Sequence, residues 1–337
     1  MAAVVECTLC PTRCVLENYQ RGDCRVRINV EGRLKTLVYG KPCAVHVDPM
    51  EKKPLFHFMP GTPIYSVATA GCNLHCKYCQ NWGISQTPPE ETRNVDLDPA
   101  KTVAEALAAG CKSVAYTYSE PIVFFEYTMD TCKLARKEGL RNVLVTAGYI
   151  EEKPLRELCE VADAANVDFK AITDDFYRET CGGRIEPVQR ALTIMQEMGV
   201  WLEVTNLLVP TLNDSPEMVE GLVGWVLDNL GPDVPLHFSR FTPMYQLANL
   251  PPTSVETLTA ARETALEAGV HFPYVGNVPG HEGNNTYCPG CGRLLVGRFG
   301  FLITDYGIVD GKCAGCGEPI PGVWERGDWD GSIRIVM

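Results

Sequence analysis

Three cysteines spaced C-x3-C-x2-C constrain this chain more than any other feature: Cys72, Cys76 and Cys79 in CNLHCKYCQNW. They directly follow an apolar, β-rich run at residues 63–69. The spacing suits three thiolates on one face of a cubane iron–sulfur cluster, which leaves the fourth iron without a protein ligand. The alternative is a structural zinc site, which needs a fourth ligand. Only His75 lies inside the loop, so we predict a 4Fe-4S cluster with one open iron.

Composition limits the classes of protein that need to be considered. The chain has 337 residues, enough for one large barrel or α/β domain with small appendages. Its 16 cysteines include C-x2-C clusters, which in a long chain indicate metals in a reducing compartment. The N-terminus lacks the pattern of a secretory signal, and no run reaches the roughly 18 apolar residues of a membrane span. We expect a cytoplasmic protein without membrane contact.

The net charge of the chain limits the classes of partner that it can bind. A formal net charge of −12 argues against a broad phosphate-binding surface, because nucleic-acid binders carry a basic face. We therefore expect no nucleic-acid partner.

Between residues 60 and 280, short β-rich runs alternate with helical stretches, the pattern of βα units around a parallel sheet. Asp98-Pro99 and Ser215-Pro216 predict helix starts, and Thr253 with Glu256 forms a candidate capping box. Six or seven units are too few for an eight-unit barrel. In barrels the chemistry lies at the C-terminal ends of strands, where the cysteine loop is expected. The expected strands are 63–69, 113–118, 142–146, 165–170, 202–208, 236–240 and 272–275.

Two further cysteine-bearing segments flank this region, so the predicted domains are 1–59, 60–280 and 281–337. In the last, YCPGCG and KCAGCG form two knuckles whose four sulfurs can close a tetrahedron around zinc. Rubredoxin-type iron is the second possibility, and the fold expected is zinc-ribbon-like or rubredoxin-like. These C-terminal cysteines are Cys288, Cys291, Cys313 and Cys316.

The N-terminal segment carries a less specific pattern, C-x2-C-x3-C-x9-C, with Cys43 outside it. We predict zinc or an auxiliary iron–sulfur cluster there, with free thiols as the alternative. These N-terminal cysteines are Cys7, Cys10, Cys14 and Cys24.

The cysteine loop, its aromatic Tyr78 and the preceding strand resemble the radical S-adenosylmethionine (radical SAM) enzymes. The resemblance implies an α/β fold with an open (β/α)6 partial barrel. It also implies that the open iron binds the amino and carboxylate groups of S-adenosylmethionine, with Tyr78 and Gln80 beside the last cysteine near that ligand.

Among the radical SAM enzymes, the glycyl-radical activating enzymes bind the methionine amino group through a Gly-Gly-Glu-Pro motif after the second strand. This chain has Tyr118-Ser119-Glu120-Pro121 instead. The resemblance therefore implies that Ser119 and Glu120 contact S-adenosylmethionine, with backbone contacts altered by the two replaced glycines. The alternative is that Glu120 caps the next helix.

Other strand ends supply further candidates. Asp168 and Lys170 share one face of the fourth strand and suit a ribose hydroxyl and a carboxylate, and the resembling family has Asp-x-Lys here. A plain ion pair is the alternative. His237 matches a cofactor-contacting histidine of the activating enzymes, although a core histidine is equally compatible. Thr146 is a weaker ribose or substrate candidate.

A closer resemblance covers nearly the whole chain. The phrases CTLCPTRC, DPMEKKPLFHFMPG, CNLHCKYCQNWGISQ and GNVPGHEGNNTYCPGCG are similar to those of the AmmeMemoRadiSam system radical SAM enzymes. That resemblance implies bacterial or archaeal cytoplasm and association with the two other proteins of that system.

The resemblance implies that S-adenosylmethionine is cleaved to a 5′-deoxyadenosyl radical, with electrons from an external reductant such as ferredoxin or flavodoxin. Three hypotheses follow: hydrogen abstraction from a small molecule, activation of a partner enzyme at a glycine, or a non-catalytic electron-transfer or interaction scaffold. We further expect both flanking cysteine segments to seal the barrel mouth.

Overall fold

The main sheet runs through the whole molecule and carries its core. A computed structural model describes residues 3–327 and 334–335, so the outermost parts of the predicted segments 1–59 and 281–337 lie outside the described residues. Within the described part, nine strands form this sheet in the order β12-β11-β10-β9-β8-β7-β6-β5-β18. Their bounds are β5 Ala44–Pro49, β6 Pro63–Ala68, β7 Ser113–Tyr116, β8 Arg141–Thr146, β9 Ala164–Asp168, β10 Trp201–Leu208, β11 Leu236–Arg240, β12 Pro273–Gly276 and β18 Arg334–Ile335.

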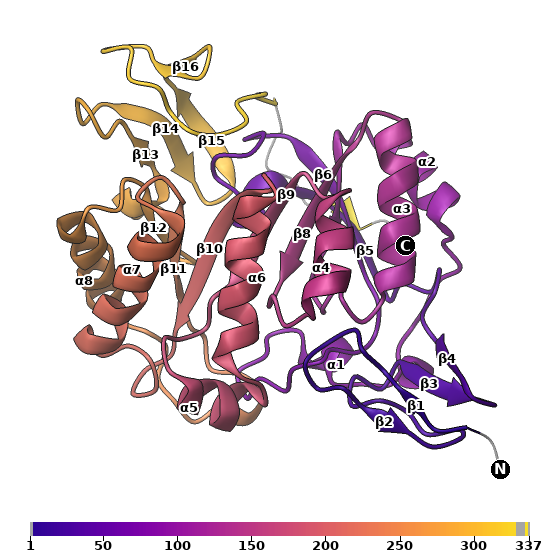
Figure 1. Cartoon of the computed structure of the whole chain (residues 1–337). Coiled ribbons are helices and arrows are strands. Elements are labelled where there is room, and N and C mark those ends of the chain that lie inside the picture. Colours follow the sequence, from indigo (N-terminus) through magenta and orange to yellow (C-terminus); the bar gives the residue numbers. More distant parts are fainter. Residues whose placement is uncertain (1–2, 328–333, 336–337) are drawn as a thin grey trace.

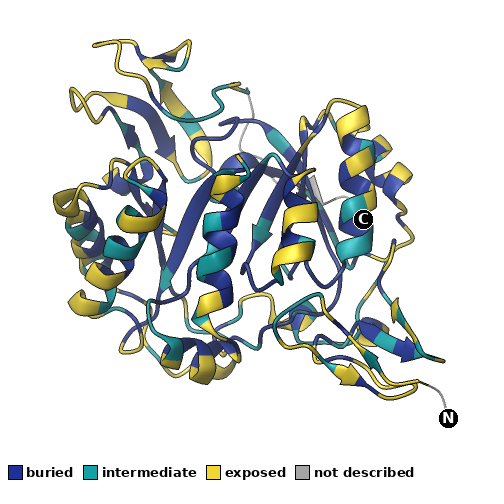
Figure 2. Ribbon diagram, in the orientation of Figure 1, coloured by how far each residue is buried: buried dark blue, intermediate teal, exposed yellow. Residues whose placement is uncertain are grey.

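Strands β6 to β12 pair in parallel, and helices cover one face of them (Figure 1). Parallel strands buried on both faces consist of nearly continuous apolar residues, and β7 is buried at every position. Figure 2 shows the same division, with a dark blue sheet and exposed outer helix faces. Six βα units followed by β12 confirm the predicted partial barrel. The helices are α1 Trp82–Ser85, α2 Pro99–Ala108, α3 Phe125–Lys137, α4 Glu152–Cys159, α5 Asp174–Phe176, α6 Ile185–Glu197, α7 Pro216–Leu230 and α8 Val255–Ala268.

Shorter elements occupy the connections. The five-residue turn Tyr177–Cys181 is a π-helix that follows α5. The 3-10 turns are Met50–Lys52, Pro89–Glu91, Tyr245–Leu247 and Glu282–Asn284.

Two of the three predicted helix starts have the expected caps. Asp98 accepts a hydrogen bond from the Lys101 backbone N–H at 2.9 Å, and Ser215 caps α7. The capping box predicted from Thr253 and Glu256 is wrong, because Ser254 is the N-cap of α8. Thr253 is buried and its hydroxyl donates to the Leu208 carbonyl at 2.6 Å, so it joins the ends of β10 and β11 instead.

The predicted N-terminal segment is divided between three places. Its first part forms two small antiparallel sheets, β1 Val5–Glu6 with β2 Val15–Leu16 and β3 Arg27–Val30 with β4 Arg33–Thr36. Its strand β5 pairs antiparallel with β6 and so belongs to the main sheet. Residues 50–59 then pack against the C-terminal segment, since Phe58 and Val323 form a β-bridge.

The C-terminal segment contains β13 Thr286–Tyr287, β14 Leu294–Phe299, β15 Leu302–Tyr306, β16 Ile308–Val309 and β17 Lys312–Cys313. Arg298 fastens it to the barrel: its guanidinium lies 4.2 Å from the Phe56 ring and donates to the Phe56 carbonyl at 2.8 Å. Because Phe56 precedes β6, this segment lies at the N-terminal ends of the strands, opposite the N-terminal sheets (Figure 1). The expectation that both flanking segments seal the mouth is therefore wrong for the C-terminal one.

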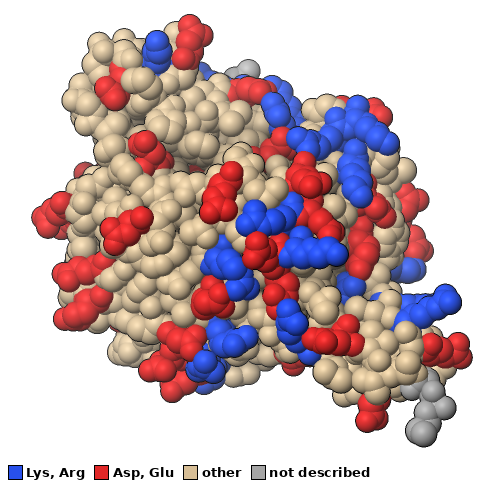
Figure 3. All heavy atoms as spheres, in the orientation of Figure 1, with Lys and Arg blue, Asp and Glu red and all other residues tan. Residues whose placement is uncertain are grey.

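Charged side chains of both signs mix on the face shown in Figure 3. On the outer side of α4, Arg156 pairs with Glu152 at 2.8 Å and lies 3.8 Å from Glu197. The basic groups there are thus matched by acidic neighbours. No helix among the described residues is long and apolar enough to cross a membrane.

Candidate active site

A pocket opens at the C-terminal ends of the parallel strands, with an empty volume of about 1110 Å³ that includes space open to solvent. It brings together the loop cysteines (Cys72, Cys76 and Cys79) and most of the strand-end residues predicted from the sequence. The predicted residues that line it are Cys72, Cys76, Tyr78, Cys79, Gln80, Ser119, Glu120, Thr146, Asp168 and Lys170.

The cysteine loop begins at Gly71, whose φ of 91° lies in the left-handed region that favours glycine. Main-chain bonds hold the loop to the turn after α5: His75 N–H donates to the Cys181 carbonyl at 2.7 Å and Lys77 N–H to the Thr180 carbonyl at 2.9 Å. The loop is therefore shaped by a segment about a hundred residues away.

The donor set of the loop fits a cubane better than a single ion. Leu74 N–H donates to Cys72 Sγ at 3.4 Å, and Ser85 Oγ lies 3.2 Å from Cys79 Sγ. His75 is engaged elsewhere, with Nδ1 2.8 Å from Gln86 Oε1 and Nε2 2.6 Å from Asp23 Oδ2. The histidine that could have completed a zinc site is thus occupied, and three thiolates remain for a cluster with an open iron.

Glu120 is a buried carboxylate held by the end of the neighbouring strand. Thr146 Oγ1 donates to it at 2.6 Å and the Ala147 N–H at 2.8 Å. No Lys, Arg or His among the described residues forms an ion pair with it, and burial raises its pKa to about 7. It does not cap α3, whose N-cap position is Phe124. A buried acceptor that forms no ion pair suits an amino group of a ligand.

Tyr118 takes a glycine-like conformation, with φ of 61°, where the activating enzymes have glycine. Its hydroxyl donates to the buried Asp48 carboxylate, and Lys53 Nζ lies 4.4 Å from its ring. These contacts hold a backbone conformation that a non-glycine residue rarely adopts. Ser119 Oγ donates to the Thr69 carbonyl at 2.8 Å. The two residues that stand in place of the glycines therefore connect this turn to β5 and to the end of β6.

Asp168 and Lys170 face the pocket together, and Lys170 Nζ lies 3.0 Å from Asp168 Oδ2. The ion pair weighed as the alternative therefore forms. Lys170 is buried, whereas the Asp168 side chain is 44% exposed. Phe169 points the other way, toward Trp225 at 4.9 Å between ring centroids. Asp168 is thus available to a ligand hydroxyl, and the pair presents both charges to the pocket.

The residues beside the last cysteine differ in burial. Tyr78 is buried, its hydroxyl lies 3.5 Å from Cys181 Sγ, and Lys170 Nζ lies 5.9 Å from its ring centroid. Gln80 is exposed at the pocket rim.

His237 does not reach this pocket. Its Nε2 lies 2.7 Å from Glu203 Oε2, and its ring stacks on Tyr274 at 4.9 Å. It stands near the start of β11, and the residue of that strand that lines the pocket is Ser239, two positions further on the same face. The strand was predicted correctly, but the structure places its histidine in the core beneath the pocket.

Sequence reasoning missed several lining residues, namely Asn81, Ser85, Leu207, Ser239 and Asn277. The alternation of side chains along a strand puts Thr205 on the same face of β10 as Glu203, and Thr205 also lines the pocket. Ser85 and Asn277 lie in connections whose paths depend on tertiary contacts, and no spacing marks them.

Comparison with known proteins identifies the family to which this architecture belongs. Residues 66–226, from β6 to α7, match the radical SAM superfamily. The uncharacterized protein MJ0808 of Methanocaldococcus jannaschii is 45% identical over 318 residues, 94% of this chain and 95% of that protein. The chain belongs to the radical SAM superfamily. The pyruvate formate-lyase-activating enzyme of Clostridium pasteurianum is 26% identical over 155 residues, 45% of this chain and 64% of that enzyme.

Solved structures agree on the fold. A radical SAM methyltransferase from Sphaerobacter thermophilus superposes with a TM-score of 0.50 and 19% identity, covering 70% of this chain and 71% of that one. Membership of the radical SAM superfamily implies a 4Fe-4S cluster and S-adenosylmethionine, and the donors of the pocket fit both groups.

At the opposite end of this radical SAM enzyme, the C-terminal cysteines form a compact tetrad. Their sulfurs all lie within 4.8 Å of one another, with Cys288 3.6 Å from Cys316 and Cys291 3.8 Å from Cys313. Zinc–sulfur bonds of about 2.3 Å in a tetrahedron place sulfurs about 3.8 Å apart. The distances are those of a single-ion site.

The two knuckles have the same main-chain geometry, which explains why CPGCG and CAGCG recur. Gly292 N–H donates to the Cys288 carbonyl and Gly317 N–H to the Cys313 carbonyl, both at 2.9 Å. Both glycines have positive φ. Gly315 N–H donates to Cys313 Sγ at 3.3 Å, which stabilises a thiolate ready to bind a metal.

We expect the paired substitution Cys291→Ser and Cys316→Ser to remove about one zinc per chain, since a structural site needs all four ligands. Metal analysis of the anaerobically prepared full chain measures this loss. Iron content and S-adenosylmethionine binding should stay unchanged, because this tetrad lies at the far end of the barrel. Iron lost instead, with rubredoxin-like absorption, would identify the metal as iron, and no metal lost would contradict the site.

The pKa of Glu120 leads to a pH-dependent affinity. The raised pKa stabilises the free protein below about pH 4.5, and this contribution is lost as pH rises through about 7. A bound amino group instead favours the ionised carboxylate. We expect the dissociation constant of S-adenosylmethionine, measured by anaerobic calorimetry, to fall about tenfold between about pH 6 and about pH 8.

Glu120→Gln should weaken this binding and remove its pH dependence, whereas the control Thr146→Ser, which keeps the hydroxyl, should preserve both. A wild-type affinity that is flat with pH and matched by Glu120→Gln would rule out this role for the carboxylate.

Proposed function

We propose that this enzyme cleaves S-adenosylmethionine reductively in the described pocket and abstracts hydrogen from a small molecule held there. The observation that carries the proposal is the convergence of the loop cysteines with Glu120, Asp168 and Lys170 on one pocket. An electron carrier or an interaction scaffold has no need of such a set. This argues against the non-catalytic alternative.

When bound, the cluster and S-adenosylmethionine supply a 5′-deoxyadenosyl radical. The protein's own residues would hold and orient that ligand. Glu120 would accept from the amino group, Lys170 would neutralise the carboxylate, and Asp168 would accept from a ribose hydroxyl. Tyr78, buried against Cys181, would close the floor of the pocket and exclude water there.

The lining of the pocket favours a small, polar substrate. Beyond the predicted contacts, polar side chains from β10, β11 and the loop after β12 remain, among them Thr205, Ser239 and Asn277. These groups suit a polar metabolite beside the adenosyl group.

A second candidate is activation of a partner enzyme at a glycine. The identity with the Clostridium pasteurianum activating enzyme favours it. Electron paramagnetic resonance separates the two: a glycine-centred signal on a candidate partner would favour activation, and turnover without any protein radical would favour the small molecule.

We infer the partners and location from the resemblance of the whole chain to the AmmeMemoRadiSam system radical SAM enzymes. They are the two other proteins of that system and a one-electron donor of the ferredoxin or flavodoxin type. The compartment would be a reducing cytoplasm, since a cluster with an open iron is sensitive to oxidants.

The test of the function is product formation. The reduced, anaerobically reconstituted full chain should release 5′-deoxyadenosine from S-adenosylmethionine, detected by chromatography and mass spectrometry. No product from protein with a full cluster would leave only the scaffold.

A further inference from the structure

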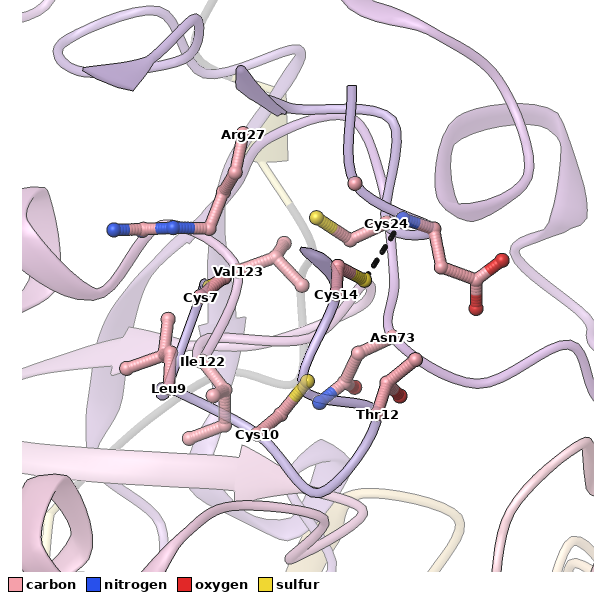
Figure 4. A pocket seen from close by; sticks show the side chains of 12 residues that line it. Cys7, Leu9, Cys10, Thr12, Cys14, Cys24, Arg27, Asn73, Ile122 and Val123 are labelled. Carbon is pink, nitrogen blue, oxygen red and sulfur yellow. Dashed lines mark hydrogen bonds between the residues drawn. The ribbon is translucent and has the colours of Figure 1, made fainter. Parts of the chain in front are cut away.

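A second cavity lies in the N-terminal segment, and the N-terminal cysteines surround it (Figure 4). The loop between β1 and β2 contributes Cys7, Cys10 and Cys14, and Cys24 comes from the turn before β3. Cys7 N–H donates to the Cys14 carbonyl at 2.9 Å, which closes this loop. The cavity has an empty volume of about 380 Å³, which includes space open to solvent. Four thiols from two loops therefore converge on one cavity.

The spacing of these sulfurs is wrong for a single ion. Among the described residues, the only group of three or more possible metal ligands whose atoms all lie within 4.8 Å is the C-terminal tetrad. The N-terminal cysteines and the loop cysteines both stand farther apart. In a cubane each thiolate binds a different iron, so its sulfurs are more widely spaced than those around zinc. The N-terminal set, like the loop cysteines, therefore lacks the close spacing of a single-ion site.

Gly22 lies beside two of the sulfurs: a Cβ built on it would be in van der Waals contact with Cys14 Sγ at 3.6 Å and with Cys24 Sγ at 3.8 Å. The backbone of this turn therefore packs directly against both ligands.

Main-chain N–H groups point at two of the sulfurs. Asp23 N–H donates to Cys14 Sγ at 3.4 Å (Figure 4). The N–H groups of Val26 and Arg27 hydrogen-bond Cys24. Arg27 is buried at the rim, where its guanidinium pairs with Glu126 at 2.5 Å. Hydrogen bonds to the sulfurs are among the features by which a protein tunes an iron–sulfur cluster.

This cavity adjoins the cysteine loop of the active site. A Cβ on Gly71, the residue before Cys72, would lie 2.5 Å from the Cys24 carbonyl oxygen. Asn73, the residue after Cys72, lines the cavity, and His75 bonds Asp23. The two sets of thiols therefore lie on two sides of one stretch of backbone. Thr12 and Asp23 at the cavity are exposed, so this side is accessible to a protein donor.

We propose that the N-terminal cysteines hold a second 4Fe-4S cluster that relays electrons to the cluster of the loop cysteines. A reduced donor of the ferredoxin or flavodoxin class loses one electron to the second cluster, and that electron passes on to the active-site cluster. The relay rests on the proposed function, whereas the existence of the second cluster does not.

The cluster is tested in a full chain that lacks the active-site ligands, Cys72→Ala, Cys76→Ala and Cys79→Ala together. After anaerobic reconstitution with ferrous iron and sulfide, we expect about four irons and four sulfides per chain. The electron paramagnetic resonance signal of the reduced protein should not change when S-adenosylmethionine is added. No iron, or a second zinc beside the C-terminal one, would overturn the proposal.

The relay is tested by stopped-flow reduction with flavodoxin hydroquinone. The variant Cys10→Ser with Cys14→Ser should lose about half of the iron and the fast phase of active-site cluster reduction. Cys43→Ser, in the same segment but outside the cavity, should keep both. An unchanged fast phase in the double variant would overturn the relay.

If the double variant does not fold, rapid-freeze spectroscopy of the wild type decides the order of reduction. The second cluster should be reduced first, and reduction of the active-site cluster before it would contradict the relay. Wild-type protein that contains both clusters but forms no 5′-deoxyadenosine would contradict the proposed function and still support the second cluster.

Discussion

Replacing any one loop cysteine by alanine is expected to abolish 5′-deoxyadenosine formation, with a loss of more than about 100-fold. Loss of a group that only supports a metal ligand already costs about 10–100-fold. Removing a ligand itself should cost more, because the cofactor carries the chemistry. The measurement is 5′-deoxyadenosine released per chain under reducing, anaerobic conditions, together with iron content.

A control is Cys132→Ala, which removes a fully buried thiol from α3, away from the pocket. It should retain iron and product formation, although its melting temperature should fall because a buried group is lost. Product formation that persists in Cys76→Ala at the wild-type level would show that the loop does not carry the reactive cluster.

The second large effect is expected for Glu203→Ala, which should lower the free energy of unfolding by about 3–5 kcal/mol. Glu203 is fully buried and accepts hydrogen bonds from the backbone N–H groups of Phe56 and His57 at 2.9 and 2.8 Å. It also contacts Trp201 Nε1 at 3.1 Å and His237 Nε2 at 2.7 Å. Its removal leaves four donors without their acceptor, three of them on buried residues. A fall in melting temperature of about 4–7 °C is the measurable result for a chain of 337 residues.

Controls separate this structural role from a role in the site. Glu203→Gln, which keeps the shape and one acceptor, should be less destabilised, and Glu197→Ala on the exposed face of α6 should change stability by less than about 0.5 kcal/mol. If Glu203→Ala unfolded at the wild-type temperature but bound S-adenosylmethionine poorly, the Glu203–His237 pair would belong to the active site. That result would restore the role first expected for His237.

Local patterns were enough for features that depend on neighbours in the sequence. The C-x2-C-G knuckles close on themselves through glycines with positive φ, so their spacing alone predicts the C-terminal tetrad. Runs of apolar residues predict the seven parallel strands, because a strand buried on both faces must be apolar throughout. The end of each strand then locates Glu120, Asp168 and Lys170 at one edge of the sheet.

Contacts between distant parts of the chain determine features that the periodicity of the sequence does not specify. His237 and Ser239 have the same phase on β11, and only the depth of the pocket determines that the second one lines it. Strand β5 was not predicted within the cysteine-rich segment, because it becomes part of the main sheet only by pairing with β6. In the same way, Asn73 and Gly71 join the two cysteine sets only through contacts between distant parts of the chain. Spacing specifies the ligands available to each site, but packing across the whole barrel sets the distances between sites and the end of the barrel at which each one lies.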